Sequence, residues 1–271
     1  MHIHILGICG TFMGGLAALA RELLPGRPRL PKPQGLRTGS WDGAPLSAAQ
    51  RQYAAADAFA SLAVWRALAS DAAARFDHEL VLDAGEVSPM VTWGTSPQHA
   101  VAIDACVPQG GASGTTPEAH ARALQYMGLE VGQSLIGLPI TGAFIGSCTN
   151  SRLSDLRRAA TILRGRKVAH GVRALCVPGS MSVKRAAEAE GLDKVFIEAG
   201  FEWRESGCSL CFFAGGESFG LRERVVSSTN RNFESRQGPE TRTHIASPET
   251  VAASALTGCI TDPRDFATRE V

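Results

Sequence analysis

The stretch FEWRESGCSLC, residues 201–211, carries two cysteines three positions apart, and a third cysteine stands upstream in IGSCTNSR, residues 145–152. Cys208 and Cys211 form a CxxC motif, and Cys148 lies in a second turn of small and polar residues. Three thiolates without an obvious fourth protein ligand indicate a site with one open position. Such a donor set suits a catalytic zinc ion, or a four-iron cluster in which one iron binds water or substrate.

The same cysteine patterns also occur without an open metal site. A CxxC motif is found in redox-active turns and zinc knuckles, and a lone buried cysteine is usually a small core residue. We expect Gly207 to let the backbone fold closely around a bound metal. Four further cysteines have no CxxC-like neighbour and are not assigned to the site: Cys9, Cys106, Cys176 and Cys259, of which Cys176 is expected in the core.

Longer motifs surround the cysteines and follow one another in a fixed order. They are WGTSP (93–97), ALQYMGLEVGQSL (123–135), FIGSCTNSR (144–152), VPGS (177–180), AEGLDKVFIEAGFEWRESGCSLC (189–211), STNRNFESRQG (228–238) and RTHIASPETVAASALTG (242–258). Over residues 74–264 the chain resembles the C-terminal part of the large subunits of the 3-isopropylmalate dehydratase group, in the aconitase family. Several multi-residue motifs in one order make this resemblance specific.

The resemblance implies a [4Fe-4S] cluster held by Cys148, Cys208 and Cys211, and a hydro-lyase activity in leucine biosynthesis. The substrate would be a 2- or 3-hydroxy di- or tricarboxylic acid that is dehydrated and rehydrated reversibly. The open iron would act as a Lewis acid. A base on a separate swivelling domain would take the proton. In the group that domain is a small subunit, so we expect a heterodimer.

The segment STNRNFESRQG, residues 228–238, is a second candidate site. Arg231 and Arg236 lie in a loop of small and amide residues, and arginine binds carboxylates bidentately, with about 1.5–3 kcal/mol per charged hydrogen bond. By itself such a loop is equally a solvated surface. The resemblance implies that both arginines bind substrate carboxylates and that Asn230 forms a hydrogen bond near the cluster. Weaker candidates beside the cysteines, which could equally form structural ion pairs, are Arg152, Arg204 and Glu205.

Two departures from the group bear on activity. The group's large subunit carries roughly a further half-chain ahead of this region, with acid residues near the cluster, and we find no match to it here. The segment FFAGGESFG, residues 212–220, replaces a different small-residue segment. We therefore assign no catalytic acid or base, whose loss costs about 10²–10⁴-fold in rate. The alternative function is a non-catalytic or degenerate iron–sulfur domain from a gene fusion.

Composition excludes several other classes of function. The net charge is +1 and 20% of residues are charged, so no nucleic-acid partner is expected. Seven irregularly spaced cysteines do not form a disulfide framework and fit a reducing cytoplasm. No apolar run reaches the length of a membrane span, so no membrane partner is expected.

The pattern from residue 71 onward predicts an α/β fold. Strands are expected over 139–146 and 172–180, with a helix from 154 to 165 between them and another starting near Ser182. This alternation implies a parallel sheet flanked by helices, an aconitase-like α/β/α domain with right-handed crossovers. Cys148 then follows the carboxyl end of a strand, where such sheets bind ligands.

Local signals refine this prediction. Residues 116–128 are expected to form a helix that ends at Gly128, whereas Val101 to Ser113 is expected to be loop. A short alternating strand is expected near residue 76. The helix after Cys148 has three candidate caps: Asn150, Ser151 and Ser154.

The first 70 residues resemble other families. Residues 1–24 resemble the first βα unit of a Mur-type ligase, where UDP would bind, although a structural βα element is favoured. Residues 25–44 form a proline-rich linker. Residues 30–68, with LPKPQGLRTGSWDG followed by YAAADAFASL, resemble the last motif of a DEDD-type 3′–5′ exonuclease, with Tyr53 and Asp57 at matching positions, although a packing helix over 46–69 is favoured. We therefore predict three parts: 1–24, 25–70 and 71–271. The third hypothesis for function, a nucleotide- or nucleic-acid-binding module, rests on the first two parts.

Overall fold

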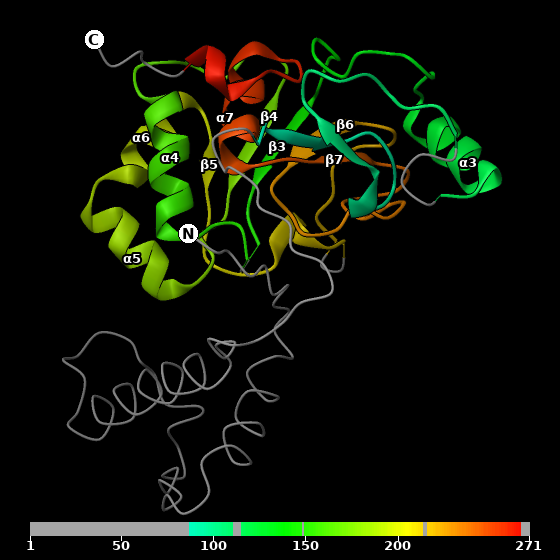
Figure 1. Cartoon of the computed structure of the whole chain (residues 1–271). Coiled ribbons are helices and arrows are strands. Elements are labelled where there is room, and N and C mark those ends of the chain that lie inside the picture. Colours follow the sequence, from blue (N-terminus) through cyan, green and yellow to red (C-terminus); the bar gives the residue numbers. More distant parts are fainter. Residues whose placement is uncertain (1–86, 111–114, 148, 214–215, 267–271) are drawn as a thin grey trace, which may run out of the picture. The chain divides into compact units, whose positions relative to one another are not determined.

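The computed structural model describes residues 87–110, 115–147, 149–213 and 216–266, which belong to one compact unit, Asp83–Val271. A five-stranded sheet forms its centre, in the order β5-β4-β3-β6-β7, and every neighbouring pair is parallel (Figure 1). The predicted parallel α/β sheet is therefore confirmed. The strands are β3 (Gly142–Ile145), β4 (Arg173–Cys176), β5 (Glu202–Trp203), β6 (Arg224–Ser227) and β7 (Arg242–Ile245).

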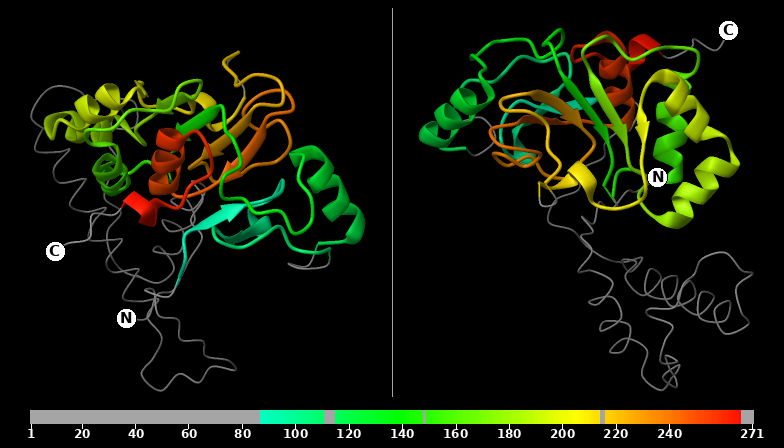
Figure 2. Two further views of the ribbon diagram at one scale, coloured as in Figure 1. Left: turned by 90° about the horizontal axis from the view of Figure 1, so that it is seen from above. Right: turned by 180° about the vertical axis from the view of Figure 1, so that it is seen from behind.

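Helices flank this sheet. Helices α4, α5 and α6 lie on the β5 side of the domain and α3 lies at the opposite end, beyond β7, as the front view (Figure 1) and the view from behind (Figure 2) show. The fifth helix, α7, follows β7. The bounds of the helices are α3 Pro117–Met127, α4 Leu153–Leu163, α5 Met181–Ala189, α6 Leu192–Ala199 and α7 Pro248–Thr257, with 3-10 turns at Pro97–His99, Ser209–Cys211 and Pro263–Phe266.

The central strands send alternate side chains to opposite faces of the sheet. On β3, Ala143 and Ile145 join the larger core with residues of α4, α6 and α7, such as Leu156 and Val251. Phe144 points the other way. It joins a smaller core against the loops that follow β5, made of Phe144, Leu175, Val177, Leu210, Phe219 and Val225. Irregular segments that contain the CxxC motif thus cover one side of the sheet.

The predicted helix over 116–128 is confirmed. The Thr116 hydroxyl accepts a hydrogen bond from Ala119 N, and Gly128 ends the helix with a left-handed backbone at φ 61°. The loop predicted from Val101 was wrong at its start, because β2 (Ala100–Ala102) pairs antiparallel with β1 (Met90–Thr92). Pairing with the preceding strand β1 decides that short strand, and the composition of residues 100–102 does not reveal it.

The cap predicted for α4 was also wrong. Arg152 is the N-cap, and its backbone N–H donates to the Asp155 carboxylate at 3.0 Å. The Asn150 side-chain nitrogen donates instead to the carbonyl of Ser228, which directly follows β6, at 2.8 Å. The residue that looked like a local cap therefore forms a long-range contact.

The path of the chain through the sheet creates a topological switch point. From the central strand β3 the chain moves outward to β4 and β5, and then returns to the other side of β3 to form β6 and β7. The connections leaving β3 and β6 therefore diverge at their carboxyl ends. Open parallel sheets bind ligands at such a switch point.

The N-terminal segments predicted from the sequence lie outside the described residues. They are residues 1–24 and 25–70, including Tyr53 and Asp57, and the strand expected near residue 76. In the part that the structure describes, no helix combines the length and the apolar character that crossing a membrane requires.

Candidate functional site

The turn that bears Cys148 is fixed to the neighbouring strand β6. The Ser228 hydroxyl accepts a hydrogen bond from Gly146 N and donates one to Gly146 O, both at 3.0 Å. The Asn150 side chain donates to Ser228 O at 2.8 Å. These contacts span the switch point between β3 and β6, so residues 147–150, here named the SCTN turn, start at the place where a ligand is expected.

Backbone strain marks the SCTN turn. Ser147 is buried and adopts a positive φ of 89°, which is unfavourable for a residue other than glycine. Its hydroxyl lies 2.9 Å from that of Thr149. Gly179, from the VPGS motif, donates its N–H to Ser151 O at 2.9 Å. Strain of this kind gathers at functional sites. Cys148 itself lies outside the described residues.

The CxxC loop, residues 208–211, is a single 3-10 turn. Cys211 N donates to Cys208 O at 2.8 Å, and both thiols are free, with Cys208 exposed and Cys211 half-buried. The residue in the left-handed region is Ser209, at φ 39°. The role expected for Gly207 beside a bound metal stays a prediction; its φ is not positive, and no described protein atom lies within 4 Å of the position of a Cβ there.

The arginine loop, residues 230–238, lies against the CxxC loop. Arg236 Nε donates to Cys211 O at 2.5 Å, and Gln237 Nε2 donates to Leu210 O at 2.8 Å. A backbone bond from Phe213 N to Arg236 O, 2.8 Å long, extends this pairing. The two loops therefore form one connected unit over the smaller core.

Gln237 connects that unit to the sheet. Its side chain is fully buried, donates to the Ser227 hydroxyl at 3.3 Å and accepts from the Thr243 hydroxyl at 3.0 Å. Ser227 ends β6 and is followed by Ser228, which holds the SCTN turn. Both cysteine-bearing segments are thus attached to the carboxyl end of one strand.

The three predicted substrate-binding residues differ in their surroundings. Arg231 is exposed and Asn230 is half-buried, and neither side chain has a hydrogen bond or ion pair to another described residue. The Arg236 side chain, by contrast, contacts other residues of the protein. Its guanidinium lies 5.3 Å from the Phe212 ring centre and 5.0 Å from that of Phe233, in addition to its bond with Cys211.

The weaker candidates near the cysteines include members of structural ion pairs. Arg204 donates its Nε to Glu202 at 3.0 Å, and Glu205 lies 3.1 Å from Lys184. Arg152 is exposed and serves as the N-cap of α4. Arg204 and Glu205 have partners within the protein, so these two side chains fit a structural role.

Thiols are the candidate metal donors of this site. Within the described ranges, no three His, Cys, Asp or Glu side chains lie close enough together to hold a metal. Two free thiols, Cys208 and Cys211, nevertheless stand on one turn. That turn and the SCTN turn, which carries the third thiol, attach to adjacent residues: Ser227, the last residue of β6, and Ser228, which follows it. The residues present therefore fit a cluster with three thiolate ligands.

Sequence reasoning missed the two residues that join the loops to β6. Ser228 and Gln237 are the first and last polar residues of the STNRNFESRQG motif, so their place in the motif was the available signal. A cleft of about 400 Å³ was also not predicted. It lies beside the SCTN turn, between β1 and the start of α7, and its lining includes Asn150, Asp155 and Ser247.

Two of the buried titratable groups lie in the sheet, His244 on β7 and Cys176 on β4. Burial, together with the nearby charge of Arg224, lowers the pKa of His244 to about 3, so this histidine is neutral. Its Nδ1 bonds to Thr92 O at 2.6 Å, and its Nε2 accepts from Arg224 at 2.8 Å, since arginine can only donate. Burial also raises the pKa of Cys176 well above its usual range. Cys176 is therefore an inert core thiol, as predicted.

The described unit is a parallel α/β domain with a candidate metal site, because its cysteine-bearing turns attach at the carboxyl end of β6, beside the switch point. Residues 45–258 match the Aconitase family (aconitate hydratase), which is most of the chain, and the chain belongs to this family. The family predicted from the sequence motifs is therefore confirmed.

Two relatives show which members of the family the chain is similar to. The chain is 67% identical over 202 residues to the 3-isopropylmalate dehydratase large subunit of Cupriavidus necator, a match covering 74% of this chain and 76% of that protein. It is 54% identical over 206 residues to the 3-isopropylmalate dehydratase large subunit 1 of Bradyrhizobium diazoefficiens, covering 75% of this chain and 43% of that protein. The chain thus spans less than half the length of the second relative.

Proposed function

We propose that this chain is a hydro-lyase component of the 3-isopropylmalate dehydratase type, which holds a [4Fe-4S] cluster through Cys148, Cys208 and Cys211. One observation carries the proposal. Both cysteine-bearing segments are attached to the carboxyl end of β6, through Ser228 on one side and Gln237 on the other. Family membership and the names of the relatives support the same chemistry.

Such a cluster, when bound, would supply a Lewis-acidic iron with one position free of protein ligands. The protein's part is to hold the thiols in a fixed arrangement before the cluster arrives. Ser147 and Ser209 adopt unfavourable backbone angles next to two of the cysteines, and the hydrogen bonds of Ser228 and Gln237 hold the segments in place. Preorganisation of this kind reduces the cost of ordering ligands on binding.

The arginine loop supplies the carboxylate-binding groups. Arg231 is exposed without an ion pair to any described residue, so its guanidinium is available to a substrate carboxylate. Arg236 is held between Phe212 and Phe233 with its Nε on Cys211 O. These contacts fix the position of the Arg236 guanidinium beside Cys211. The substrate class that fits is a hydroxy di- or tricarboxylic acid.

The complete reaction also needs groups for proton transfer, for which no residue of this chain is assigned. We propose that a small subunit supplies a swivelling domain over the site, forming a heterodimer, as the large-subunit names of the relatives suggest. The reaction is then the reversible dehydration and rehydration of isopropylmalate in leucine biosynthesis.

The first experiment measures iron and acid-labile sulfide per chain after anaerobic reconstitution, for the parent and Cys211→Ser. We expect about four irons and four sulfides per chain in the parent, and a loss of bound iron or of cluster stability in the variant. A Cys259→Ser variant is the matched control, because Cys259 is also half-buried and belongs to neither cysteine segment. No iron or sulfide in a folded parent contradicts the proposal.

A second candidate function is a cluster-binding domain without catalysis. Arg204 and Glu205, beside the CxxC motif, form ion pairs within the protein, and no described residue is assigned to proton transfer, which favours this candidate. An isopropylmalate dehydration assay with added small subunit separates the two. Turnover by the reconstituted parent supports the enzyme, and a loaded cluster without turnover supports the second candidate.

A further inference from the structure

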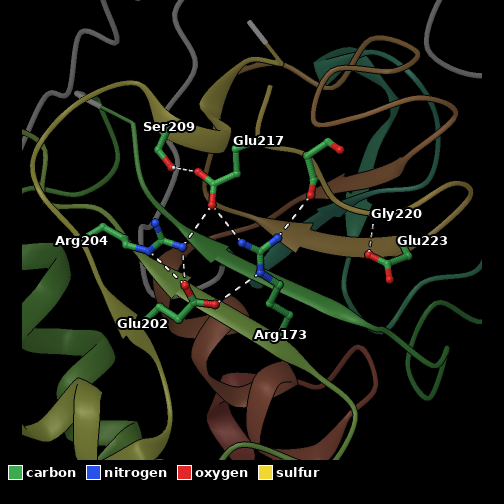
Figure 3. A network of polar contacts seen from close by, with 8 residues as sticks. Arg173, Glu202, Arg204, Ser209, Glu217, Gly220 and Glu223 are labelled. Atoms are coloured by element: carbon green, nitrogen blue, oxygen red, sulfur yellow. Dashed lines mark hydrogen bonds and ion pairs between the residues drawn. The ribbon is translucent and has the colours of Figure 1, made fainter. Parts of the chain in front are cut away.

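A cluster of charged side chains lies beside the CxxC loop, and its centre is Glu217 (Figure 3). Arg173 Nη2 donates to Glu217 Oε1 at 2.9 Å, and Arg204 Nη2 donates to the same oxygen at 3.1 Å. The other carboxylate oxygen, Oε2, accepts from the Ser209 hydroxyl at 3.3 Å. Ser209 stands between the two cysteines of the CxxC motif.

The two arginines belong to the sheet. Arg173 is the first residue of β4, and Arg204 directly follows β5, where its N–H donates to Cys176 O at 2.9 Å. Both also bind Glu202, the first residue of β5. Glu217 therefore joins a rigid part of the fold to a residue inside the metal-binding motif.

Ser209 needs such a contact. Its φ of 39° lies in the left-handed region, where a residue other than glycine is unstable unless the surroundings hold it. Its hydroxyl has no described partner except Glu217. Losing that hydrogen bond would free Ser209 to relax toward an ordinary conformation and would change the spacing of the thiols on either side.

We propose that Glu217 is a positioning residue that holds the CxxC loop in its metal-binding conformation, by linking Ser209 to Arg173 and Arg204. This inference deepens the proposed function and rests on it for the identity of the metal group. The members of the cluster are about one-third to two-fifths exposed. Because salt screens partly exposed charges, the hold on the loop weakens as ionic strength rises.

The test uses Glu217→Gln and Glu217→Ala, with Glu223→Gln as the matched control. Glu223 stands in the same segment, but among the described residues its carboxylate accepts only from the backbone N–H of Gly220, at 2.8 Å (Figure 3). Two rates are measured. One is the alkylation of Cys211 in the metal-free protein, followed by peptide mass spectrometry with Cys259 as internal reference. The other is the release of iron to a chelator from the reconstituted protein.

We expect both rates to rise about 2- to 10-fold in the Glu217 variants, more in Glu217→Ala, and to stay at the parental value in Glu223→Gln. High salt raises the parental rates toward those of Glu217→Gln and leaves that variant unchanged. Parental rates in both Glu217 variants, or equal increases in Glu223→Gln, overturn the inference.

Folding is checked by far-ultraviolet circular dichroism. If Glu217→Ala does not fold, Ser209→Ala replaces it, with the same expected increase and no further increase when combined with Glu217→Gln. The alkylation rate separates the two proposals. A parent that binds no iron contradicts the proposed function, whereas unchanged Cys211 alkylation contradicts the role of Glu217.

Discussion

Arg236 holds the main chain of Cys211. Its Nε donates to the Cys211 carbonyl at 2.5 Å, and its Nη2 lies 3.6 Å from the Cys211 sulfur. The predicted substrate residue therefore touches a predicted cluster ligand. Arg231, in the same loop, has no such contact among the described residues. The two arginines must differ in what they do for the protein before any substrate is present.

Substituting these arginines separates the two roles. We expect Arg236→Ala to lower the free energy of unfolding by about 1–3 kcal/mol, because Cys211 O loses its charged donor and two aromatic rings lose a cation. Arg231→Ala is expected to stay within about 0.5 kcal/mol of the parent. Urea denaturation followed by circular dichroism measures both. Equal stabilities would show that the bond to Cys211 contributes nothing to the fold.

Gln237 is expected to matter more for structure than a glutamine normally does. Gln237→Ala leaves the buried groups Leu210 O, Ser227 Oγ and Thr243 Oγ1 without this partner. Each unsatisfied buried group costs about 1–3 kcal/mol. We predict destabilisation in at least this range and faster alkylation of Cys211. Asn230→Ala is the control, and comparable losses in the two variants would contradict the bridging role.

Two glycines beside the cysteine segments should respond in opposite ways to alanine. At Gly179 a Cβ would stand 2.9 Å from Ser151 O, a backbone atom that cannot move independently, whereas at Gly207 it would meet nothing. We expect Gly179→Ala to cost about 1–3 kcal/mol through overpacking, and Gly207→Ala to be tolerated. Thermal melting of the metal-free proteins checks this. A stable Gly179→Ala variant would mean that the VPGS motif does not press on the SCTN turn.

Stability should fall in mild acid because of His244. Its pKa is about 3 in the folded protein against a usual value of 6.5, so below pH 6.5 the unfolded chain takes up a proton that the folded one refuses. The stability that the neutral His244 contributes to the folded protein is fully present above pH 6.5. It declines by about 1.4 kcal/mol per pH unit as the pH falls toward 3.

His244→Gln provides the comparison for this pH effect. The variant lacks the titrating group, so its unfolding free energy should depend less steeply on pH between 6.5 and 5. Urea denaturation at pH 7.5, 6.5, 5.5 and 5.0 measures the slope. Identical slopes in parent and variant would show that His244 does not control the acid sensitivity.

The sequence allowed much of the fold to be predicted, because helix and strand signals in this chain are local. The helix over 116–128 follows from Thr116 and Gly128, and the alternation of β3 and α4 predicts a parallel pair. The strand β2 and the cap of α4 were missed. The strand β2 depends on its pairing with β1, and Asn150 is drawn to the carbonyl of Ser228, which is far away in sequence.

The sequence motifs of the candidate site could be recognised, but the hydrogen bonds that connect its loops could not be predicted. Family motifs pointed to Cys208 and Cys211, which stand on one turn, and to Cys148, and the ligand role of all three cysteines remains a prediction. Nothing in the sequence linked Glu217 to Ser209 or Gln237 to Leu210, because a hydrogen bond between loops depends on how they pack. FFAGGESFG looked only like a departure from the family, yet it carries Glu217.

The return of the chain to the centre of the sheet has a consequence for folding order. Gly146 and the serine that fixes it are 82 residues apart, and β6 can insert beside β3 only after β4, β5 and the CxxC segment have been synthesised. Contacts of such long sequence separation form late, because the entropy of closing the intervening loop opposes them. The two cysteine-bearing segments therefore come together late, and the proposed metal centre could form only after the sheet has closed.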